Sequence, residues 1–185
     1  DVLRVKTTAS IDPLGAVELK ELKINGAGAI LNASGNFDSS QNIGNLKFNI
    51  QNNDSKPFDQ LAQGAKWNSF SVSGEALGDL SKPNVYVKLK LQKPSFENNF
   101  ADSVSIVATS KGKLDSPTVI VNAAVINPEA ADFSAHSIDL RASSSGLLKS
   151  PTVITNLKLK NPRAQDVEIK EVYLKAEVTG DLKQP

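Results

Sequence analysis

Apolar and polar residues alternate along much of this chain. In the run 119–125, Val, Val, Ala and Val occupy every second position, and the runs 85–91 and 153–159 repeat the alternation. A period of two is that of a β-strand with one apolar face, because successive side chains point to opposite sides. The pattern predicts strands at 84–92, 103–109, 118–126, 137–143, 152–160 and 167–178.

The same residue types also return at a spacing of 34. Gly112 is followed by Leu114, Pro117, Val119 and Pro128, and the matching positions 34 residues before and after hold the same five types. Self-similarity at a fixed period of this size is typical of repeat proteins. Proline flanks the first strand of each repeat, and Gly-x-Leu marks the turn into the next one. We therefore predict an all-β array of stacked strand repeats, with two strands and two connections in each.

The repeats define the expected domain organisation. We predict a single elongated domain over 1–185, with regular repeats at 78–111, 112–145 and 146–179 and a truncated repeat at 180–185. Residues 1–77 form irregular units, of which one opens at Gly44 and carries Phe48 and Ile50 one residue out of step. VELKELKI at 17–24 matches VEIKEVYL at 167–174, so it is expected to be the second-half strand of an early unit.

One segment breaks the alternation. PFDQLAQGAKW at 57–67 is expected to form one or two helical turns that pack Phe58, Leu61 and Trp67 as a cap. The segment before it holds a tight turn at Asn25-Gly26 and Gly28, which predicts a hairpin into the strand 30–35.

Composition excludes several classes of protein. The 21 Lys and Arg residues balance 20 Asp and Glu residues, which gives no reason to expect nucleic acid. The chain has no cysteine and therefore no thiolate metal site. No apolar run approaches the roughly 18 residues that span a bilayer. With no initiator Met, no signal peptide and a repeat that stops at Pro185, we expect a piece of a longer protein.

Residues for catalysis are sparse. The single histidine, His136, has Asp102 and Lys170 as its repeat equivalents, which favours a solvated loop residue over a general base. No nucleophile elbow, P-loop, zinc motif or calcium-loop spacing is present. We expect no enzyme, no cofactor and no metal site.

The apolar stripe is the remaining candidate for a functional site. It is interpreted either as a sealed core or as an open groove in which the stripes of successive repeats align. Val107, Ile120 and Ile154 on the opposite face leave room for partial two-sided burial. The candidate groove residues are Leu46, Phe48, Ile50, Phe70, Val72, Val85, Val87, Leu89, Leu91, Val104, Ile106, Val119, Val121, Val125, Ile138, Leu140, Val153, Leu157, Leu159, Val172 and Leu174.

The pattern of Gly, five residues to Pro and V-x-V-x-L-x-L, ending in VEIKEVYLKAEVTG, resembles the C-terminal region of the TamB family. It is also similar to the wider AsmA-like, bridge-type lipid-transfer proteins of Gram-negative envelopes. The likeness covers about residues 16–185 and is strongest from Gly78 on. It implies a sheet curled into a U-shaped "β-taco" with an apolar interior. It further implies a periplasmic location, an inner-membrane anchor outside this sequence and an outer-membrane barrel partner, TamA.

Three functions follow as alternatives. The first is a groove that carries phospholipid acyl chains between inner and outer membrane or supports outer-membrane protein assembly. The second is a closed structural or adhesive β-solenoid. The third is a chaperone-like module for nascent outer-membrane β-strands. They differ in what contacts Val121 and Leu157: lipid, protein core or a partner strand.

Overall fold

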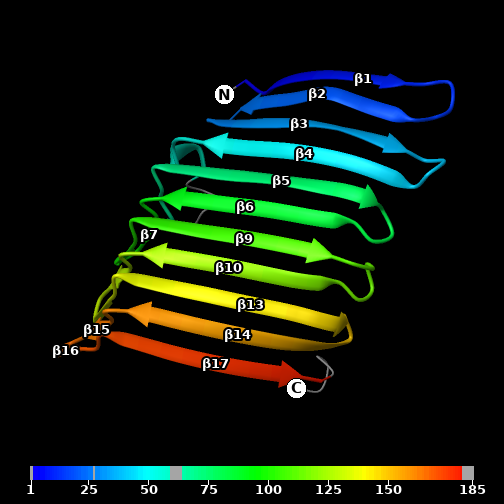
Figure 1. The fold of residues 1–185 in the computed structure, drawn as a ribbon. Coiled ribbons are helices and arrows are strands. Elements are labelled where there is room, and N and C mark those ends of the chain that lie inside the picture. Colours follow the sequence, from blue (N-terminus) through cyan, green and yellow to red (C-terminus); the bar gives the residue numbers. More distant parts are fainter. Residues whose placement is uncertain (1, 27, 59–63, 181–185) are drawn as a thin grey trace.

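The chain forms one large antiparallel sheet in which every strand pairs with its neighbours along the chain (Figure 1). The computed structural model describes residues 2–26, 28–58 and 64–180. The eleven strands of this large sheet are β1 (Arg4–Ile11), β2 (Val17–Gly26), β3 (Ala29–Asp38), β4 (Ile43–Asn52), β5 (Ser69–Asp79), β6 (Asn84–Gln92), β9 (Ser103–Lys111), β10 (Thr118–Ile126), β13 (Ser137–Leu147), β14 (Ser150–Lys160) and β17 (Glu171–Thr179). The sheet is open, because β1 and β17 occupy opposite edges and do not pair with each other.

Short turns connect the strands at one end, which we call the turn end. Gly78, Gly112 and Gly146 have φ of 95°, 100° and 91°, a left-handed conformation that glycine adopts without a Cβ clash. Successive turns are hydrogen-bonded to one another, since the amide of Leu114 donates to the Ser81 carbonyl and that of Leu148 to the Asp115 carbonyl. The Gly-x-Leu motif therefore reverses the chain and also joins each repeat to the one before it.

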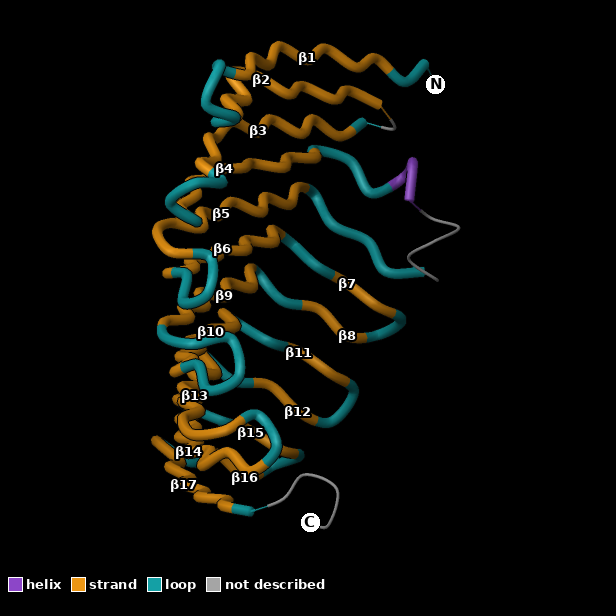
Figure 2. The backbone as a smooth tube through the Cα atoms, turned by 90° about the vertical axis from the view of Figure 1, so that its right-hand side faces the viewer, coloured by secondary structure: helices purple, strands orange, loops and turns teal. Residues whose placement is uncertain are grey.

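At the opposite end, the hairpin end, the links between strands build a second sheet of six strands. These are β7 (Ser95–Phe96), β8 (Asn99–Phe100), β11 (Glu129–Ala130), β12 (Phe133–Ser134), β15 (Arg163–Ala164) and β16 (Val167–Glu168), each of two residues. Figure 2 shows this small sheet projecting to one side of the large sheet. Sequence analysis missed it, because two residues are too few to show a period.

Three equivalent residues form the corner between the two sheets. Lys93, Asn127 and Asn161 have φ of 48°, 47° and 46°, and each is followed by proline. Proline has no N–H to donate and so cannot continue the ladder of the large sheet. The amide of each corner residue donates instead to the carbonyl nine residues later, for example from Asn127 to His136. The X-Pro pair thus ends the long strand and starts the small hairpin.

The N-terminal strands lack this arrangement. Gly26 of β2 pairs directly with Ala29 of β3, so only two residues link these strands at the hairpin end. The hairpin predicted there is confirmed, although residue 27 lies outside the described residues. β2 is continuous but irregular between Leu19 and Leu22, and the matching point of VEIKEVYL is where β16 ends and β17 begins. The pattern therefore forms one strand with a bulge at 17–24, and it is divided between β16 and β17 at 167–174. The single strand predicted at 167–178 is thus two strands.

The longer link 53–68 contains a 3-10 helix, η1 (Lys56–Phe58). The rings of Phe58, Trp67 and Phe70 have centroids 5.8 to 6.3 Å apart. Asn52 is only 1% exposed, and it donates to the Gly28 carbonyl and accepts from Trp67 Nε1 at 2.7 Å. The predicted packing of Phe58 and Trp67 is thus confirmed with Phe70 as third partner, while Leu61 lies outside the described residues.

The predicted all-β fold of stacked repeats is confirmed, with corrections to individual elements. Strands 84–92 and 118–126 match, whereas those predicted at 103–109, 137–143 and 152–160 extend to 103–111, 137–147 and 150–160. Gly44 is not equivalent to Gly78, because it lies at the start of β4 and pairs with Gly78, which lies near the end of β5. Phe48 pairs with Gly74, and Gly74 pairs with Val87, so Phe48 and Val87 lie on the same face. Val87 follows Phe48 by 39 residues in the sequence. That odd number is why Phe48 looked out of step with a period of 34.

Candidate functional site

One face of the large sheet is apolar across all eleven strands. The strand pairing aligns a central row of side chains, one from each strand and none of them polar: Val5, Ile24, Leu31, Ile50, Val72, Leu89, Ile106, Ala123, Leu140, Leu157 and Leu174. Neighbouring strands are about 4.8 Å apart, so the row is about 50 Å long. Residues at even offsets from this row lie on the same face, which we call the apolar face.

All 21 candidate groove residues lie on the apolar face. Leu46, Val85, Val119 and Val153 form a row toward the turn end, and Phe70, Leu91, Val104, Val125, Ile138, Leu159 and Val172 form one toward the hairpin end. Phe48, Val87 and Val121 lie in the row between the turn-end row and the central row. The others belong to the central row. Val107, Ile120 and Ile154 lie on the opposite face, as expected.

The apolar face meets the small sheet in a corner. A cavity of about 370 Å³ there is lined by Phe70 and Leu91 of the apolar face, by Trp67 and by Phe96 and Phe100 of the small sheet. In the small sheet Phe96 pairs with Asn99. Farther along, Ala130, Phe133, Ala164 and Val167 form one apolar row. The small sheet thus forms one wall of a trough whose floor is the apolar face.

At the turn end of the large sheet, the turns between strands extend the floor of the trough. A second cavity, of about 300 Å³, is lined by Leu46 and Ala76 of the apolar face and by Leu80 of the β5–β6 turn. Leu80 reaches over Gly44, where a Cβ would approach its Cδ2 to 3.0 Å. Because Gly44 has no side chain, the side chain of Leu80 can pack over it. Leu80 thus borders the trough on the side opposite the small sheet.

Nothing in the described part of the chain covers the floor. Among its aliphatic and aromatic side chains other than proline, only Ala135 is buried. Val87, Leu89 and Val121 are half-buried by their neighbours on the sheet, and Leu174 on the edge strand is 58% exposed. A sealed core would make these central side chains inaccessible. The geometry is that of an open trough.

Charged groups lie outside the trough floor. At the corner, Asp102 forms an ion pair with Lys93 and accepts from Asn127 Nδ2 at 2.6 Å; these contacts lower the pKa of its carboxyl group. On β1 and β2, the hydrogen bond and charge of Lys6 lower the pKa of Glu21. Both pairs are exposed and peripheral, so they add little stability each.

In the described residues, the side chains that could bind a metal ion are not clustered. His136 is exposed in the link between β12 and β13, where only its backbone is engaged. Over residues 2–26, 28–58 and 64–180, no three His, Cys, Asp or Glu side chains are placed to hold a metal ion. In the same ranges no helix has the length and hydropathy needed to cross a membrane. What the described residues do offer is an extended apolar surface.

Comparisons of the chain with protein-family models, curated proteins and solved structures found no match.

Proposed function

We propose that the trough carries the acyl chains of lipids. The observation that supports this most directly is an apolar face of eleven strands that stays uncovered and is bordered by the small sheet and the turns. Contiguous exposed apolar surface of this extent is rare on soluble proteins unless it binds a partner. An acyl chain in water costs roughly 0.8 kcal/mol for each exposed CH₂ group, and the trough removes much of that cost without any catalytic group.

The repeat favours movement along the trough. Because the strands of successive repeats pair in the same register, every regular repeat presents its apolar residues on the same face. Leu89, Ala123 and Leu157 occupy equivalent places in successive repeats, so a chain that shifts by one repeat meets a similar surface. Sliding between near-equivalent positions then has a low barrier, and the polar headgroup stays in water at the open side.

The cellular context stays a prediction from the resemblance to the TamB family. Transport between inner and outer membrane, a periplasmic location and a TamA-like barrel partner belong to that resemblance. The chaperone-like alternative uses the same apolar face, with an unfolded outer-membrane protein strand in place of lipid. The identity of the bound molecule therefore separates the two.

A charged residue introduced into the floor of the trough tests whether the trough binds lipid. In Val121→Arg and Leu89→Arg, the arginine stem can lie along apolar neighbours while the guanidinium group reaches water at the open side. We expect folding and a melting temperature close to the wild type, with loss of the phospholipid that the wild type retains in native mass spectrometry. Asn122→Arg, on the opposite face, is the matched control and should change neither. Unfolding of Val121→Arg, as expected for an unpaired charge in a sealed core, would contradict the proposal.

Photo-crosslinking in cells tests the same faces without introducing a charge. A crosslinker at Val87, Val121 or Leu157 should capture phospholipid, and one at Lys88, Asn122 or Lys158, one residue further along, should not. Capture of protein rather than lipid at the first three positions would support the chaperone-like alternative. Equal capture from both faces would indicate nonspecific membrane contact.

A further inference from the structure

The face of the large sheet opposite the trough carries a row of hydrogen-bond donors. The row beside the central apolar one consists of Lys6, Lys23, Asn32, Asn49, Ser73, Lys88, Val107, Asn122, Arg141, Asn156 and Lys175. Five of its members are cations and none is an anion. Whereas the whole chain is nearly neutral, this polar row is basic.

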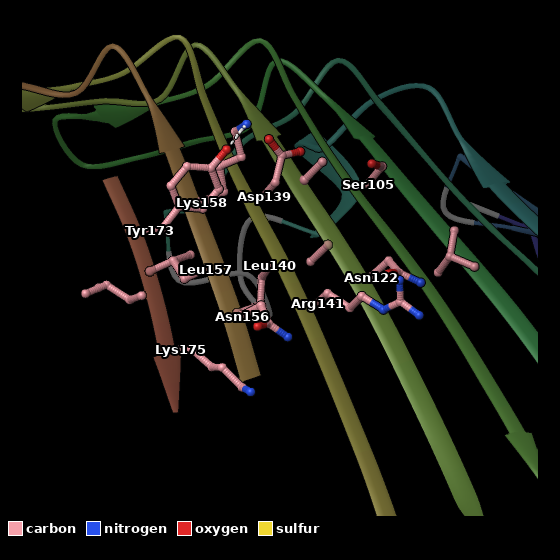
Figure 3. A pocket seen from close by; sticks show the side chains of 14 residues that line it. Ser105, Asn122, Asp139, Leu140, Arg141, Asn156, Leu157, Lys158, Tyr173 and Lys175 are labelled. Carbon is pink, nitrogen blue, oxygen red and sulfur yellow. Dashed lines mark hydrogen bonds between the residues drawn. The ribbon is translucent and has the colours of Figure 1, made fainter. Parts of the chain in front are cut away.

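The row runs through a depression of about 480 Å³ over β9 to β17, larger than either cavity of the trough (Figure 3). Asn122, Arg141, Asn156 and Lys175 line it on consecutive strands. Arg141 and Lys175 are two strands apart, which places their attachment points about 10 Å from each other. Two cationic side chains are therefore attached at a fixed spacing, with the amide side chain of Asn156 attached between them.

These four side chains make no hydrogen bond or ion pair within the described residues. The six ion pairs there involve other cations, such as Lys158 with Glu171. Arg141 has five N–H donors in a planar fork that matches a carboxylate or phosphate, and Lys175 adds a mobile charge. These four side chains can thus bind negative groups without first breaking contacts of their own.

The second row of the depression offers both acceptors and donors. Asp139 accepts from Ser137 Oγ at 3.0 Å and keeps further acceptor capacity. Lys158 donates to Tyr173 Oη at 2.5 Å, and its Nζ lies 4.7 Å from the centre of the tyrosine ring. A ligand that spans the two rows must present negative groups on one side and hydroxyl groups on the other.

We propose that this depression binds an acidic sugar chain, an oligosaccharide whose carboxylate or phosphate groups contact Arg141 and Lys175. Its hydroxyl groups, which both donate and accept, match Asp139 and the amides of Asn122 and Asn156. An acidic peptide fits less well, because its carboxylates would meet Asp139. β10, β13 and β14 are paired on both sides, so within the depression a peptide backbone could add to the sheet only at the outer edge of β17. The site is on the opposite face from the trough and does not depend on lipid binding.

Isothermal titration calorimetry with two probes tests the proposal: tetragalacturonate, which has a carboxylate on each sugar, and a phosphomannan oligomer. At least one should bind, and the preferred probe identifies the acid group. Arg141→Gln and Lys175→Gln should each weaken binding about tenfold, the usual size for a hydrogen bond to a charged group. Added salt should weaken it as well.

Lys88→Gln is the matched control, because Lys88 belongs to the same row but lies outside the depression. It should leave the affinity within about twofold, and circular dichroism should show all three variants folded. Neutral maltotetraose should not bind detectably. The proposal is overturned if neither acidic probe binds, if Lys88→Gln weakens binding as much as Arg141→Gln, or if hexaglutamate binds as tightly as the sugars.

Discussion

Strands β1 to β4 and strands β6 to β17 share one apolar face but differ at the hairpin end. In the first region two residues join β2 to β3, and among the described residues no strand of the small sheet comes from this region. In the second, each link has ten residues and contributes a hairpin to the small sheet. The floor itself is similarly exposed in both regions: Leu31 and Ile50 are half-buried, as are Leu89 and Leu140.

This difference shows that the floor and the wall of the trough have separate causes in the sequence. The alternation along each strand places an apolar face on both regions. The length of the link decides whether that face becomes a trough, because a two-residue turn closes the ladder and ten residues can leave the plane of the sheet. The floor and the wall can therefore be altered independently.

The largest effect is expected from converting one repeat to the N-terminal type. Ile126 pairs with Ser137, so Asn-Gly in place of residues 127–136 can join β10 to β13 directly. This change removes β11 and β12 and interrupts the small sheet. We expect a folded sheet by circular dichroism and about tenfold weaker retention of lipid in native mass spectrometry, equal to the burial of about two CH₂ groups.

The matched control shortens the turn end of the same repeat. Lys111 pairs with Thr118, and Asn-Gly in place of residues 112–117 removes no part of the small sheet. Leu114 is lost, but its side chain is 62% exposed. Retention of lipid should fall less than with the replacement of 127–136, because only one turn at the border of the floor is lost. If both replacements weaken it equally, the small sheet is not a wall of the binding site.

A smaller effect is expected at the junction of the two regions. Trp67→Ala removes the ring between Phe58 and Phe70 and takes the indole donor from buried Asn52. We expect a loss of about 3 kcal/mol in the free energy of unfolding, measured with urea. Hydrogen exchange should quicken in β4 and β5 more than in β13 and β14. Trp67→Phe keeps a ring and should lose about 1 kcal/mol. A loss below about 0.5 kcal/mol for Trp67→Ala would show that the cluster does not join the regions.

The smallest effect concerns one corner of the wall. The hydrogen bonds and charge of Lys93, together with Asn127, lower the pKa of Asp102 in the folded protein. A carboxyl group with a lowered folded pKa stabilises the protein above its unfolded pKa and loses this contribution as the pH falls through the folded value. Asp102→Asn should therefore lower the urea midpoint at pH 6, and the difference should disappear in strong acid.

A double-mutant cycle with Lys93→Gln isolates this corner from the other acidic groups. The coupling between Asp102 and Lys93 should be present at pH 6 and absent in strong acid. A coupling that does not change with pH would show that the ion pair is not its source.

The sequence predicted the long strands and the apolar face because both depend on local alternation. The alternation within 118–126 and within 152–160, for example, assigns Val121 and Leu157 to the apolar side of their strands. The small sheet was not predictable in this way, since strands such as β11 have two residues and their pairing is set by the corner residues. The apolar residues Phe96, Phe100, Phe133 and Val167 in mostly polar links were the available signal. Phe48 was misaligned because a longer link, 53–68, separates β4 from the regular repeats.

The even spacing of the repeat has a consequence for how such an array can grow. A duplication or deletion of a whole 34-residue unit adds or removes two strands of the large sheet and one hairpin of the small one. Both faces, the corner and the stacking of the turns are then preserved, and the trough changes length by about 10 Å. An insertion of one residue within a strand would instead exchange the two faces from that point on. Whole units are therefore the step in which the length of this protein can evolve or be engineered.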